Sequence, residues 1–441
     1  MSSSSPGAGQ ASEPRSDHPL RYRNYRMYLI GRLSNGFAVN GMTLVIGWQV
    51  YTIARQTMET KAAAAQLGMI GLVQFLPMLL LTPVAGLIAD HFDRRRIAQS
   101  TSLLLCLCSA ALALATFEGW ISLPILFALS SFLGVARAFN GPAYNSLAPN
   151  LVPINILPRA VAISSTTWQS AIIIGPALGG YLYAIKDWAA YAAATLLFTI
   201  GITAFSFIGK VPQPPRDTTR HPIRQMVDGL AYVKRNRLVQ GAITLDLFAV
   251  LLGGATALLP VYARDILHGG PTGLGHLAAS PAIGAAATGL WFSFHPLKTE
   301  VGVKILFAVV VFGIATIVFG ATAFMPSSIA MPVAMGAMVL WGSADMFSVF
   351  VRQTLVQVYT PDSMRGRVSS VSQLSISASN QLGEAESGFL AALIGPVACV
   401  IFGGAGAIIV TLIWSRLYPE LRLARTFDPP GSVAEPVQKE S

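Results

Sequence analysis

Ionisable side chains interrupt long apolar stretches of this 441-residue sequence. Four of them are carboxylic acids in the second half of the chain: Asp246, Asp345, Glu384 and Glu386. A carboxyl group taken out of water favours its neutral form, so it can exchange a proton near neutral pH. We therefore expect proton coupling here, with Asp345 as the first candidate and Glu384 as the second. For Asp246 a contact at the end of a helix is the alternative to proton coupling.

Helical geometry separates the two glutamates and suggests neighbours for the other acids. Glu384 and Glu386 are about 200° apart on a helix, so they cannot face the same cavity. Asn380 shares a face with Glu384 at i, i+4 spacing. Arg352 follows Asp345 by seven residues on the same face, where the two can pair.

The elements that position these groups must lie in a membrane. Hydrophobic residues make up 53% and charged residues 11% of the chain, against about a quarter charged in soluble domains. Several stretches carry no Asp, Glu, Lys or Arg: 97–117, 160–185, 188–209, 305–344 and 387–415. A helix needs roughly 20 apolar residues to cross a bilayer, so 305–344 must hold two helices. Pro326 marks the break between them.

The apolar stretches predict an all-α membrane protein with twelve transmembrane helices. Continuous runs of this length exclude a transmembrane barrel, whose strands alternate over about 10 residues. The helices expected in the first half are 27–53, 67–89, 97–117, 121–148, 160–185 and 188–209. Those expected in the second half are 238–261, 273–296, 302–324, 328–358, 367–391 and 395–416.

The basic residues indicate the orientation of these helices. The net charge is +10, and 23 of the 30 Lys and Arg residues fall in the tails and in the loops on the same side. This excess marks the cytoplasmic face, so we expect a multi-pass protein of the cell (inner) membrane with both termini cytoplasmic. The expected surroundings are membrane lipid, with no nucleic acid partner, no metal or organic cofactor, and a monomeric chain.

An internal repeat divides the chain. A shift of 208 residues aligns 134–182 with 342–390 without a gap, and the identities include three glycines, a loop proline and an arginine on the cytoplasmic side. Two six-helix halves of the same orientation follow from this alignment. The predicted organisation is a disordered cytoplasmic tail at 1–20, a bundle at 21–209, a cytoplasmic linker at 210–237, a second bundle at 238–418 and a cytoplasmic tail at 419–441. Within the linker, 224–233 is amphipathic enough for a short interfacial helix.

The same alignment places Arg137 on Asp345, so opposite charges occupy equivalent depths. Each lies 16 residues before a loop proline, roughly 24 Å along a helix, and a charge at that depth must be paired or face water. We expect both to line an aqueous cavity between the halves. The alternative is an ion pair that only holds the helices together.

Further side chains are candidates for the wall of this cavity. Trp168 lies deep enough to stack on an aromatic ligand, although ordinary helix packing is the simpler explanation. Gln169, Asn380 and Arg352 offer polar groups at comparable depth. Arg32, near the start of the first span, is expected instead to extend its guanidinium to the membrane surface.

A motif at the end of the second span points to a gate. The sequence from Gly86 to Arg96, GLIADHFDRRR, resembles the loop 2–3 signature of the major facilitator superfamily of transporters. The resemblance implies a contact that is made in one conformation and broken in the other, formed by Gly86, Asp90, Arg94 and Arg95. Asp93 stands where the superfamily has a glycine, which questions the tightness of that turn.

Two further motifs resemble those of the superfamily. The stretch from Arg137 to Gly141, RAFNG, is similar to its arginine motif, which is linked to proton coupling. The stretch GPALGG is similar to the antiporter motif of exporters, and it implies a hinge at Gly175, Pro176, Gly179 and Gly180. Proline removes a backbone hydrogen bond and glycines permit close packing, so this helix can bend at an interface.

A narrower resemblance covers nearly the whole chain. Segments including QFLP at 74–77, RGRV at 365–368 and YPELR at 418–422 resemble the enterobactin-exporter-like, or transmembrane secretion effector, family, whose characterised members export siderophores and drugs. The resemblance implies a small-molecule substrate and protons as partners, and efflux with a link to drug resistance.

These observations favour a secondary transporter, an antiporter that exports an amphipathic small molecule while protons enter. An importer or facilitator of the same fold is the alternative. An intramembrane enzyme is disfavoured because no HExxH or GxSxG motif occurs, and an ATP-driven pump because no phosphate-binding loop occurs.

Overall fold

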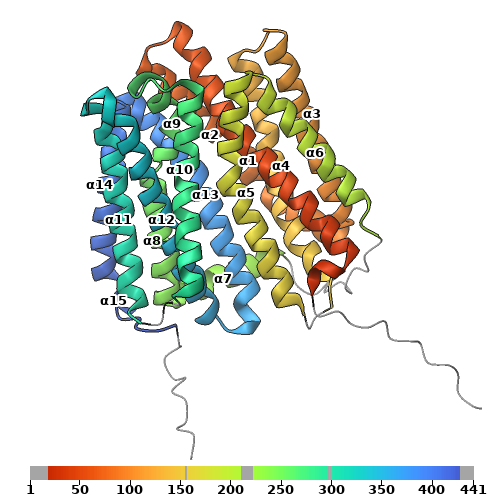
Figure 1. Ribbon diagram of the computed structural model, residues 1–441. Coiled ribbons are helices and arrows are strands. Elements are labelled where there is room, and N and C mark those ends of the chain that lie inside the picture. Colours follow the sequence, from red (N-terminus) through yellow and green to blue (C-terminus); the bar gives the residue numbers. More distant parts are fainter. Residues whose placement is uncertain (1–17, 154–155, 210–221, 296, 298, 428–441) are drawn as a thin grey trace, which may run out of the picture.

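The computed structural model describes residues 18–153, 156–209, 222–295, 297 and 299–427. Residues 1–17 of the tail predicted at 1–20 lie outside the described residues. The same applies to 210–221 of the predicted linker and to 428–441 of the predicted C-terminal tail. Within the described ranges every regular element is helical, as the sequence predicts (Figure 1).

The first half of the described chain holds six long helices. They are α1 (Arg23–Thr57), α2 (Thr60–His91), α3 (Arg94–Phe117), α4 (Leu123–Leu147), α5 (Leu157–Ile185) and α6 (Ala189–Ser206). The helices α1 and α2 begin four and seven residues before the predicted spans, so they extend past the apolar core of a bilayer.

The second half begins with an amphipathic helix where one is predicted, α7 (Pro222–Arg235). The long helices that follow are α8 (Arg237–Leu252), α10 (Gly270–Phe294), α11 (Val301–Ala321), α12 (Ser327–Val358), α13 (Asp362–Ile394) and α14 (Pro396–Leu417). Pro326 caps the start of α12, so the predicted break within 305–344 is confirmed.

Residues beyond the predicted end of the second bundle also pack against it. A short helix, α15 (Pro419–Arg422), contacts α8 and α11. Leu421 is fully buried, and the amide of Gly302 donates to the carbonyl of Ala424 at 2.9 Å. The described residues 419–427, which the sequence assigns to the C-terminal tail, thus pack on the second bundle.

The span predicted at 238–261 is wrong as a single helix. After Leu252 the chain forms a 3₁₀ turn (Ala255–Leu258), the short helix α9 (Leu259–Val261) and a π-helical turn (Tyr262–Ile266). Two glycines cause the break, because neighbouring helices press on the backbone here. A Cβ on Gly253 would lie 2.6 Å from the Phe312 ring, and one on Gly254 would lie 2.2 Å from the Ser387 hydroxyl.

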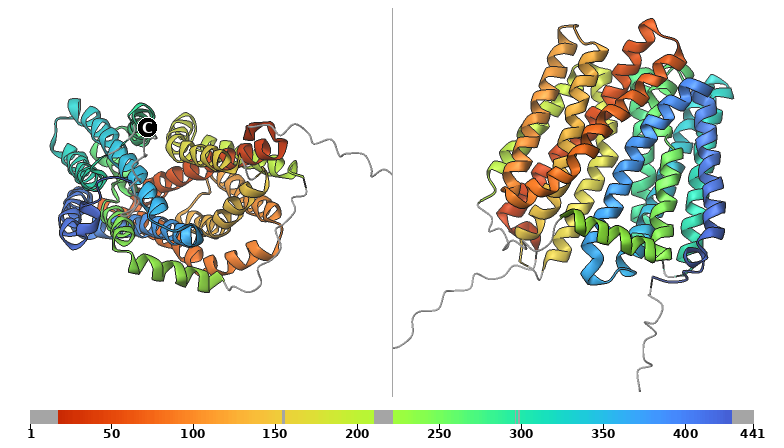
Figure 2. Two further views of the ribbon diagram at one scale, coloured as in Figure 1. Left: turned by 90° about the horizontal axis from the view of Figure 1, so that it is seen from below. Right: turned by 180° about the vertical axis from the view of Figure 1, so that it is seen from behind.

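Helix pairs in the two halves pack in corresponding ways. In the first half α2 packs on α4 and α3 packs on α4 and α6; in the second half α10 packs on α12 and α11 packs on α12 and α14. The most extensive contacts between the halves are those of α2 with α13 and of α5 with α10. Figures 1 and 2 show the long helices running roughly side by side, with the start of α1, α7 and α15 at one end.

Ten of the helical segments are long and apolar enough to cross a membrane; α5 and α13 are not among them. Both carry exposed polar side chains, Ser165 and Thr166 on α5 and Gln373 and Asn380 on α13. Such groups are unfavourable against lipid tails. The two long helices that lack such an apolar stretch both take part in joining the halves, where their polar faces can meet water.

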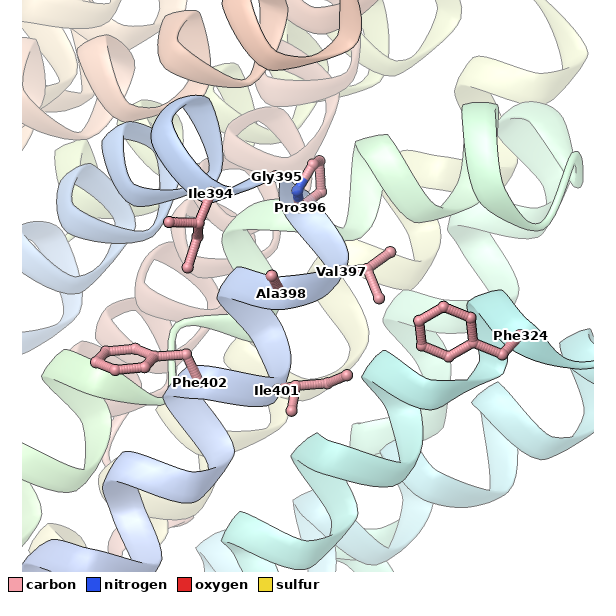
Figure 3. Close-up of a pocket in the computed structure, with 8 residues that line it drawn as sticks. All are labelled: Phe324, Ile394, Gly395, Pro396, Val397, Ala398, Ile401 and Phe402. Carbon is pink, nitrogen blue, oxygen red and sulfur yellow. The ribbon is translucent and has the colours of Figure 1, made fainter.

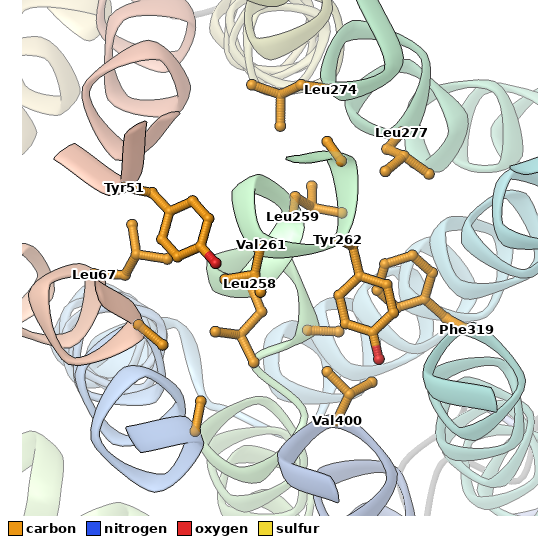
Figure 4. Packing of buried hydrophobic residues seen from close by; sticks show 14 of the residues in the cluster. Tyr51, Leu67, Leu258, Leu259, Val261, Tyr262, Leu274, Leu277, Phe319 and Val400 are labelled. Atoms are coloured by element: carbon orange, nitrogen blue, oxygen red, sulfur yellow. The ribbon is translucent and has the colours of Figure 1, made fainter. Parts of the chain in front are cut away.

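A buried apolar cluster connects the halves at the end of the molecule opposite the start of α1 (Figure 4). Tyr51 and Leu67 come from α1 and α2, whereas Leu258, Tyr262 and Phe319 come from the second half. The next three clusters in size each draw their residues from one half. The halves are therefore sealed together by an apolar core at this end, which we call the sealed end.

Candidate functional site

A buried ion pair lies inside the second half. Arg352 of α12 places Nη2 3.2 Å from Oδ1 of Asp246 on α8, and the two side chains are only 3% and 7% exposed. The predicted partner of Arg352 was Asp345, which is two turns away along the same helix, roughly 10 Å. The helix α8 passes beside Arg352, so Asp246 takes that place. The prediction of a helix-end contact for Asp246 was also wrong.

Asp345 and Asp246 line the same small, partly open space. The space lies among α8, α11 and α12. The volume that the centre of a water molecule can occupy is about 10 Å³, which is about enough for one water. Its other walls are mainly apolar, including Val309, Phe312 and Ala344. Asp345 is half-buried and interacts electrostatically with both members of the ion pair. The group therefore contains two carboxylates and one guanidinium, so one carboxylate has no cation of its own.

Arg137 lies between the halves. Its Nη2 donates to the hydroxyl of Thr43 on α1 at 3.0 Å, and its charge interacts with that of Glu384 on α13. Glu384 reaches this place because α13 packs on Gly71 of α2, where an added Cβ would lie 3.1 Å from the glutamate Cβ. The structure thus brings together two of the three predicted proton-coupling residues, and Asp345 lies with Asp246 instead.

The two glutamates of α13 face different neighbours, as their spacing predicts. Glu384 faces α2, whereas Glu386 accepts from the adjacent Ser387 hydroxyl at 3.4 Å and interacts with Cys399 of α14.

A polar cluster fills the corresponding depth of the first half. Asn35 of α1 donates from Nδ2 to the hydroxyls of Ser102 at 2.6 Å and Tyr144 at 2.8 Å. One turn earlier, Arg32 donates from Nη1 to the hydroxyl of Tyr28 at 2.6 Å. The prediction that Arg32 extends to the membrane surface is wrong, because aromatic rings hold its guanidinium inside the half. In the sequence, the one indication of this position was Tyr28, four residues before Arg32 on the same helix face.

The remaining predicted cavity residues lie at the boundary of the halves or on the exposed face of α13. Trp168 is half-buried and lies over Arg32. Gln169 has Nε2 4.0 Å from the sulfur of Met346 in the second half, and Asn380 is exposed on α13.

The loop motif after α2 makes contacts within the first half. Asp93 caps α3 by accepting from the amide of Arg95 at 2.9 Å, which explains an aspartate where the superfamily has glycine. Arg95 also donates to the carbonyl of Ile208 at the end of α6. The helix α2 includes Gly86 and Asp90, but their side-chain surroundings lie outside what the structure describes.

The predicted hinge lies within a continuous α5, which contains Pro176 as an internal residue. Its glycines bring backbones together. A Cβ on Gly179 would lie 2.5 Å from the carbonyl oxygen of Gly41 on α1, and one on Gly180 would lie 2.7 Å from Cα of Gly275 on α10. Gly175 packs likewise against Asn40.

An ion pair joins the halves at the sealed end, and the sequence analysis did not find it. Asp265, after the broken helix, accepts from Nε of Arg55 at 2.7 Å and from the hydroxyl of Tyr51 at 2.6 Å. Arg264 donates to the carbonyl of Thr52 at 2.9 Å. These contacts tie α1 to the second half beside the apolar cluster.

An open apolar groove near the start of α14 is not a chemical site. It has a volume of about 710 Å³ and lies between the start of α14 and Phe324 (Figure 3). Its lining consists of Gly395, Pro396 and apolar side chains such as Ile401 and Phe402. Among the described residues no group of three His, Cys, Asp or Glu side chains could hold a metal ion.

Comparisons with known proteins agree on the class of molecule. The transmembrane secretion effector family matches residues 37–429. The macrolide efflux protein A of Streptococcus pyogenes is 27% identical over 248 residues, 53% of this chain and 58% of that protein. The enterobactin exporter EntS of Citrobacter koseri is 25% identical over 346 residues, covering 78% of this chain and 80% of that protein.

Solved structures agree on the fold. The D-xylose-proton symporter superposes with a TM-score of 0.66 at 15% identity, covering 91% of this chain and 98% of that one. The POT family transporter PepTSo gives a TM-score of 0.68 at 15% identity, with the same coverage. At these identities the likeness is one of fold.

The helical fold, the apolar helices and the family match lead to one conclusion. The chain is an integral, multi-pass membrane transporter rather than an enzyme, and it belongs to the transmembrane secretion effector family of the major facilitator superfamily.

Proposed function

We propose that this protein exports an amphipathic small molecule, siderophore-like or drug-like, in exchange for protons. The printed activities of its relatives, enterobactin export and macrolide efflux, support the direction and the substrate class. The chain spans 58% of the length of the macrolide efflux protein, so the similarity to that relative covers only part of a transporter. The single observation that carries the proposal is the pair of opposite charges, Arg137 and Glu384, held between the two halves.

The working unit is two parallel six-helix bundles, 21–209 and 238–418, joined by the linker 210–237. Twelve helices span the membrane when α5 and α13 are counted with the ten apolar segments. The repeat supports this arrangement. Gly180 of α5 packs on Gly275, and Gly388, 208 residues after Gly180, packs on Gly68 of α2. The α5 side of one seam and the α13 side of the other thus use glycines at corresponding positions of the repeat.

The protein lies in the cell (inner) membrane as a monomer, with the tails 1–20 and 419–441 and the linker in the cytoplasm. The excess of Lys and Arg in these segments supports this orientation, as does the placement of α7, α15 and the start of α1 at one end (Figure 1). The sealed end then faces outward, and the halves are arranged for access from the cytoplasm.

Proton coupling uses the carboxylates. Asp345, the carboxylate that is not in the Asp246–Arg352 ion pair, takes up a proton from the small space beside it. Glu384 loses its attraction to Arg137 when it is protonated, so protonation weakens a contact between the halves. Gly86, Asp90, Arg94 and Arg95 act as the conformational gate, and the glycines and Pro176 of α5 act as the hinge during the exchange.

Everted membrane vesicles test this function. With an imposed proton gradient, vesicles containing the protein should accumulate radiolabelled erythromycin or enterobactin, and Asp345→Asn should lower the gradient-driven accumulation at least tenfold. The matched control is Asp187→Asn, an exposed carboxylate at the sealed end. Accumulation that persists after the gradient is collapsed would refute proton exchange, and movement in the opposite direction would support an importer.

A further inference from the structure

Arg32 lies in an aromatic enclosure in the first half. The carbon at the centre of its guanidinium is 5.6 Å from the centroid of the Trp168 ring and 5.9 Å from the centroids of both Tyr28 and Tyr144. Three helices supply these rings, α1, α4 and α5. Aromatic faces attract a cation, so the enclosure fixes the position of the guanidinium. They do not neutralise its charge.

No carboxylate compensates Arg32 among the described residues. The other interior or interface arginines have acidic neighbours: Arg352 has Asp246, Arg55 has Asp265, Arg367 has Asp228, and Arg137 interacts with Glu384. Arg32 has only the neutral hydroxyl of Tyr28. Since a guanidinium has five N–H donors, most of its capacity is unused.

One of these unused donors is in an unfavourable position. The Nε atom of Arg32 is buried and has no hydrogen-bond partner in the structure. A buried donor without an acceptor is destabilising, and such groups are rare in folded proteins. A ligand that brings an anionic oxygen to this place supplies both the missing acceptor and the missing negative charge.

Arg32 is not fully enclosed by its neighbours. Arg32 is half-buried and lies nine residues into α1, roughly 14 Å from the start of the helix. It is therefore in the part of the molecule away from the sealed end, where the larger buried clusters do not join the halves. Trp168 is also half-buried, and its neighbour Gln169 reaches toward Met346 of the second half.

We propose that Arg32 binds an acidic group of the transported molecule, a carboxylate or an ionised phenol, and that Trp168 packs on the ring or chain that carries it. This inference rests on the proposed function, because it assigns a subsite for the cargo of the same transporter. It narrows the substrate class from amphipathic molecules in general to organic anions.

Binding to the full-length protein in detergent tests the inference without requiring transport. The probes are salicylate and its neutral analogue salicylamide, measured by isothermal titration calorimetry. We expect saturable binding of salicylate and at least tenfold weaker binding of salicylamide. Arg32→Gln should weaken salicylate binding about 10- to 100-fold, as expected for a lost charge-assisted hydrogen bond, and Arg32→Lys should restore part of it.

The matched control is Arg26→Gln, because Arg26 lies on the same helix but is exposed. It should bind salicylate as the natural protein does. Trp168→Ala should weaken binding several-fold, whereas Trp168→Phe should retain most of it. Equal affinities for salicylate and salicylamide, or an Arg32→Gln variant that is folded and binds normally, would overturn the proposal.

The same binding measurement distinguishes cargo from two other sources of an anion, the protein's own N-terminal segment and a lipid headgroup. If an acidic residue of the chain's own N-terminal segment occupies Arg32, Glu13→Gln with Asp17→Asn will tighten salicylate binding several-fold. If a lipid headgroup occupies it, phosphatidylglycerol will displace salicylate competitively. Either result overturns the assignment to cargo, whereas unchanged affinity in both cases supports it.

Transport distinguishes this inference from the proposed function. Loss of gradient-driven export with salicylate binding intact would count against proton exchange and leave the Arg32 site in place. Export of an anionic cargo that Arg32→Gln leaves unchanged would count against the site and leave the transporter in place.

Discussion

Arg32 in the first half and Arg352 in the second half both lie inside the helix packing, but their surroundings differ. In the second half Arg352 is almost fully buried and paired with Asp246. In the first half Arg32 is half-buried among aromatic rings and has no acidic partner within the part of the chain that the structure describes. The repeat register of 208 residues places Tyr144 at the position of Arg352. A neutral ring and hydroxyl in one half thus correspond to a charge in the other, and we infer that one half is built for a ligand's charge and the other for a proton.

The largest loss of stability is expected when Arg352 is replaced, which tests the comparison of the two arginines directly. Arg352→Gln leaves Asp246 and Asp345 without a cation in a buried space, and removal of one partner of a buried ion pair costs about 3–5 kcal/mol. The melting temperature in detergent should fall strongly. Adding Asp246→Asn should recover part of the loss, because the orphaned charge is then removed. A single variant as stable as the natural protein would contradict the pairing.

The seams between the halves offer the next largest effect. A Cβ on Gly388 would lie 2.1 Å from the amide nitrogen of Gly68, whereas one on Gly180 would lie 2.7 Å from Cα of Gly275. Gly388→Ala should therefore destabilise this conformation by up to about 3 kcal/mol, and Gly180→Ala by less. Thermal unfolding measures both. Gly336→Ala is the control, since no atom lies within 4 Å of its Cβ; equal losses in all three would refute the packing argument.

A smaller effect is expected at the ion pair that joins the halves at the sealed end. Asp265→Asn weakens the contacts to Arg55 and Tyr51, but the ion pair is 19–27% exposed, so the shift toward an open end should be about 1 kcal/mol. Cys399 reports on it, because this thiol is 3% exposed within the apolar cluster. Its alkylation, followed by mass spectrometry, should become roughly five times faster. Asp187→Asn should leave the rate unchanged, and an unaltered rate for Asp265→Asn would exclude a role in closure.

The smallest expected effect concerns the stability of the first half. Arg32→Gln removes a charge that no acid in the described ranges compensates, so it should change the free energy of unfolding by less than about 1 kcal/mol, in contrast to Arg352→Gln. Thermal unfolding of both variants in the same detergent makes the comparison. A loss at Arg32 as large as that at Arg352 would mean that the aromatic enclosure holds the half together and serves no ligand.

Composition and the lengths of the apolar runs were sufficient to predict the helical membrane fold and most helix positions. An apolar run of this length can satisfy its backbone hydrogen bonds inside a bilayer only as a helix. They were not sufficient where a neighbouring helix decides the outcome. Arg352 was assigned to Asp345 on its own helix, but α8 supplied Asp246. The helix after Arg237 breaks at Gly253 because Phe312 packs there, and nothing in the local sequence requires that contact.

The same limit applies to the candidate site. The depth of Arg137 could be read from its distance to a loop proline, but its neighbour Glu384 depends on how α13 lies on Gly71. Arg32 looked like a surface residue because only Tyr28 is close in sequence, and the rings of Tyr144 and Trp168 arrive from helices more than a hundred residues away. Asp265 follows a broken helix whose path the apolar pattern does not reveal.

The glycine contacts Gly68–Gly388 and Gly180–Gly275 have a mechanical consequence. Backbones that touch without intervening side chains can turn against one another with little repacking, so the two seams can serve as twin pivots. A rocking motion about them leaves each half internally unchanged. The free-energy difference between the two orientations then resides mainly outside the pivots, in the apolar cluster and the Asp265 contacts that come apart when the far end opens.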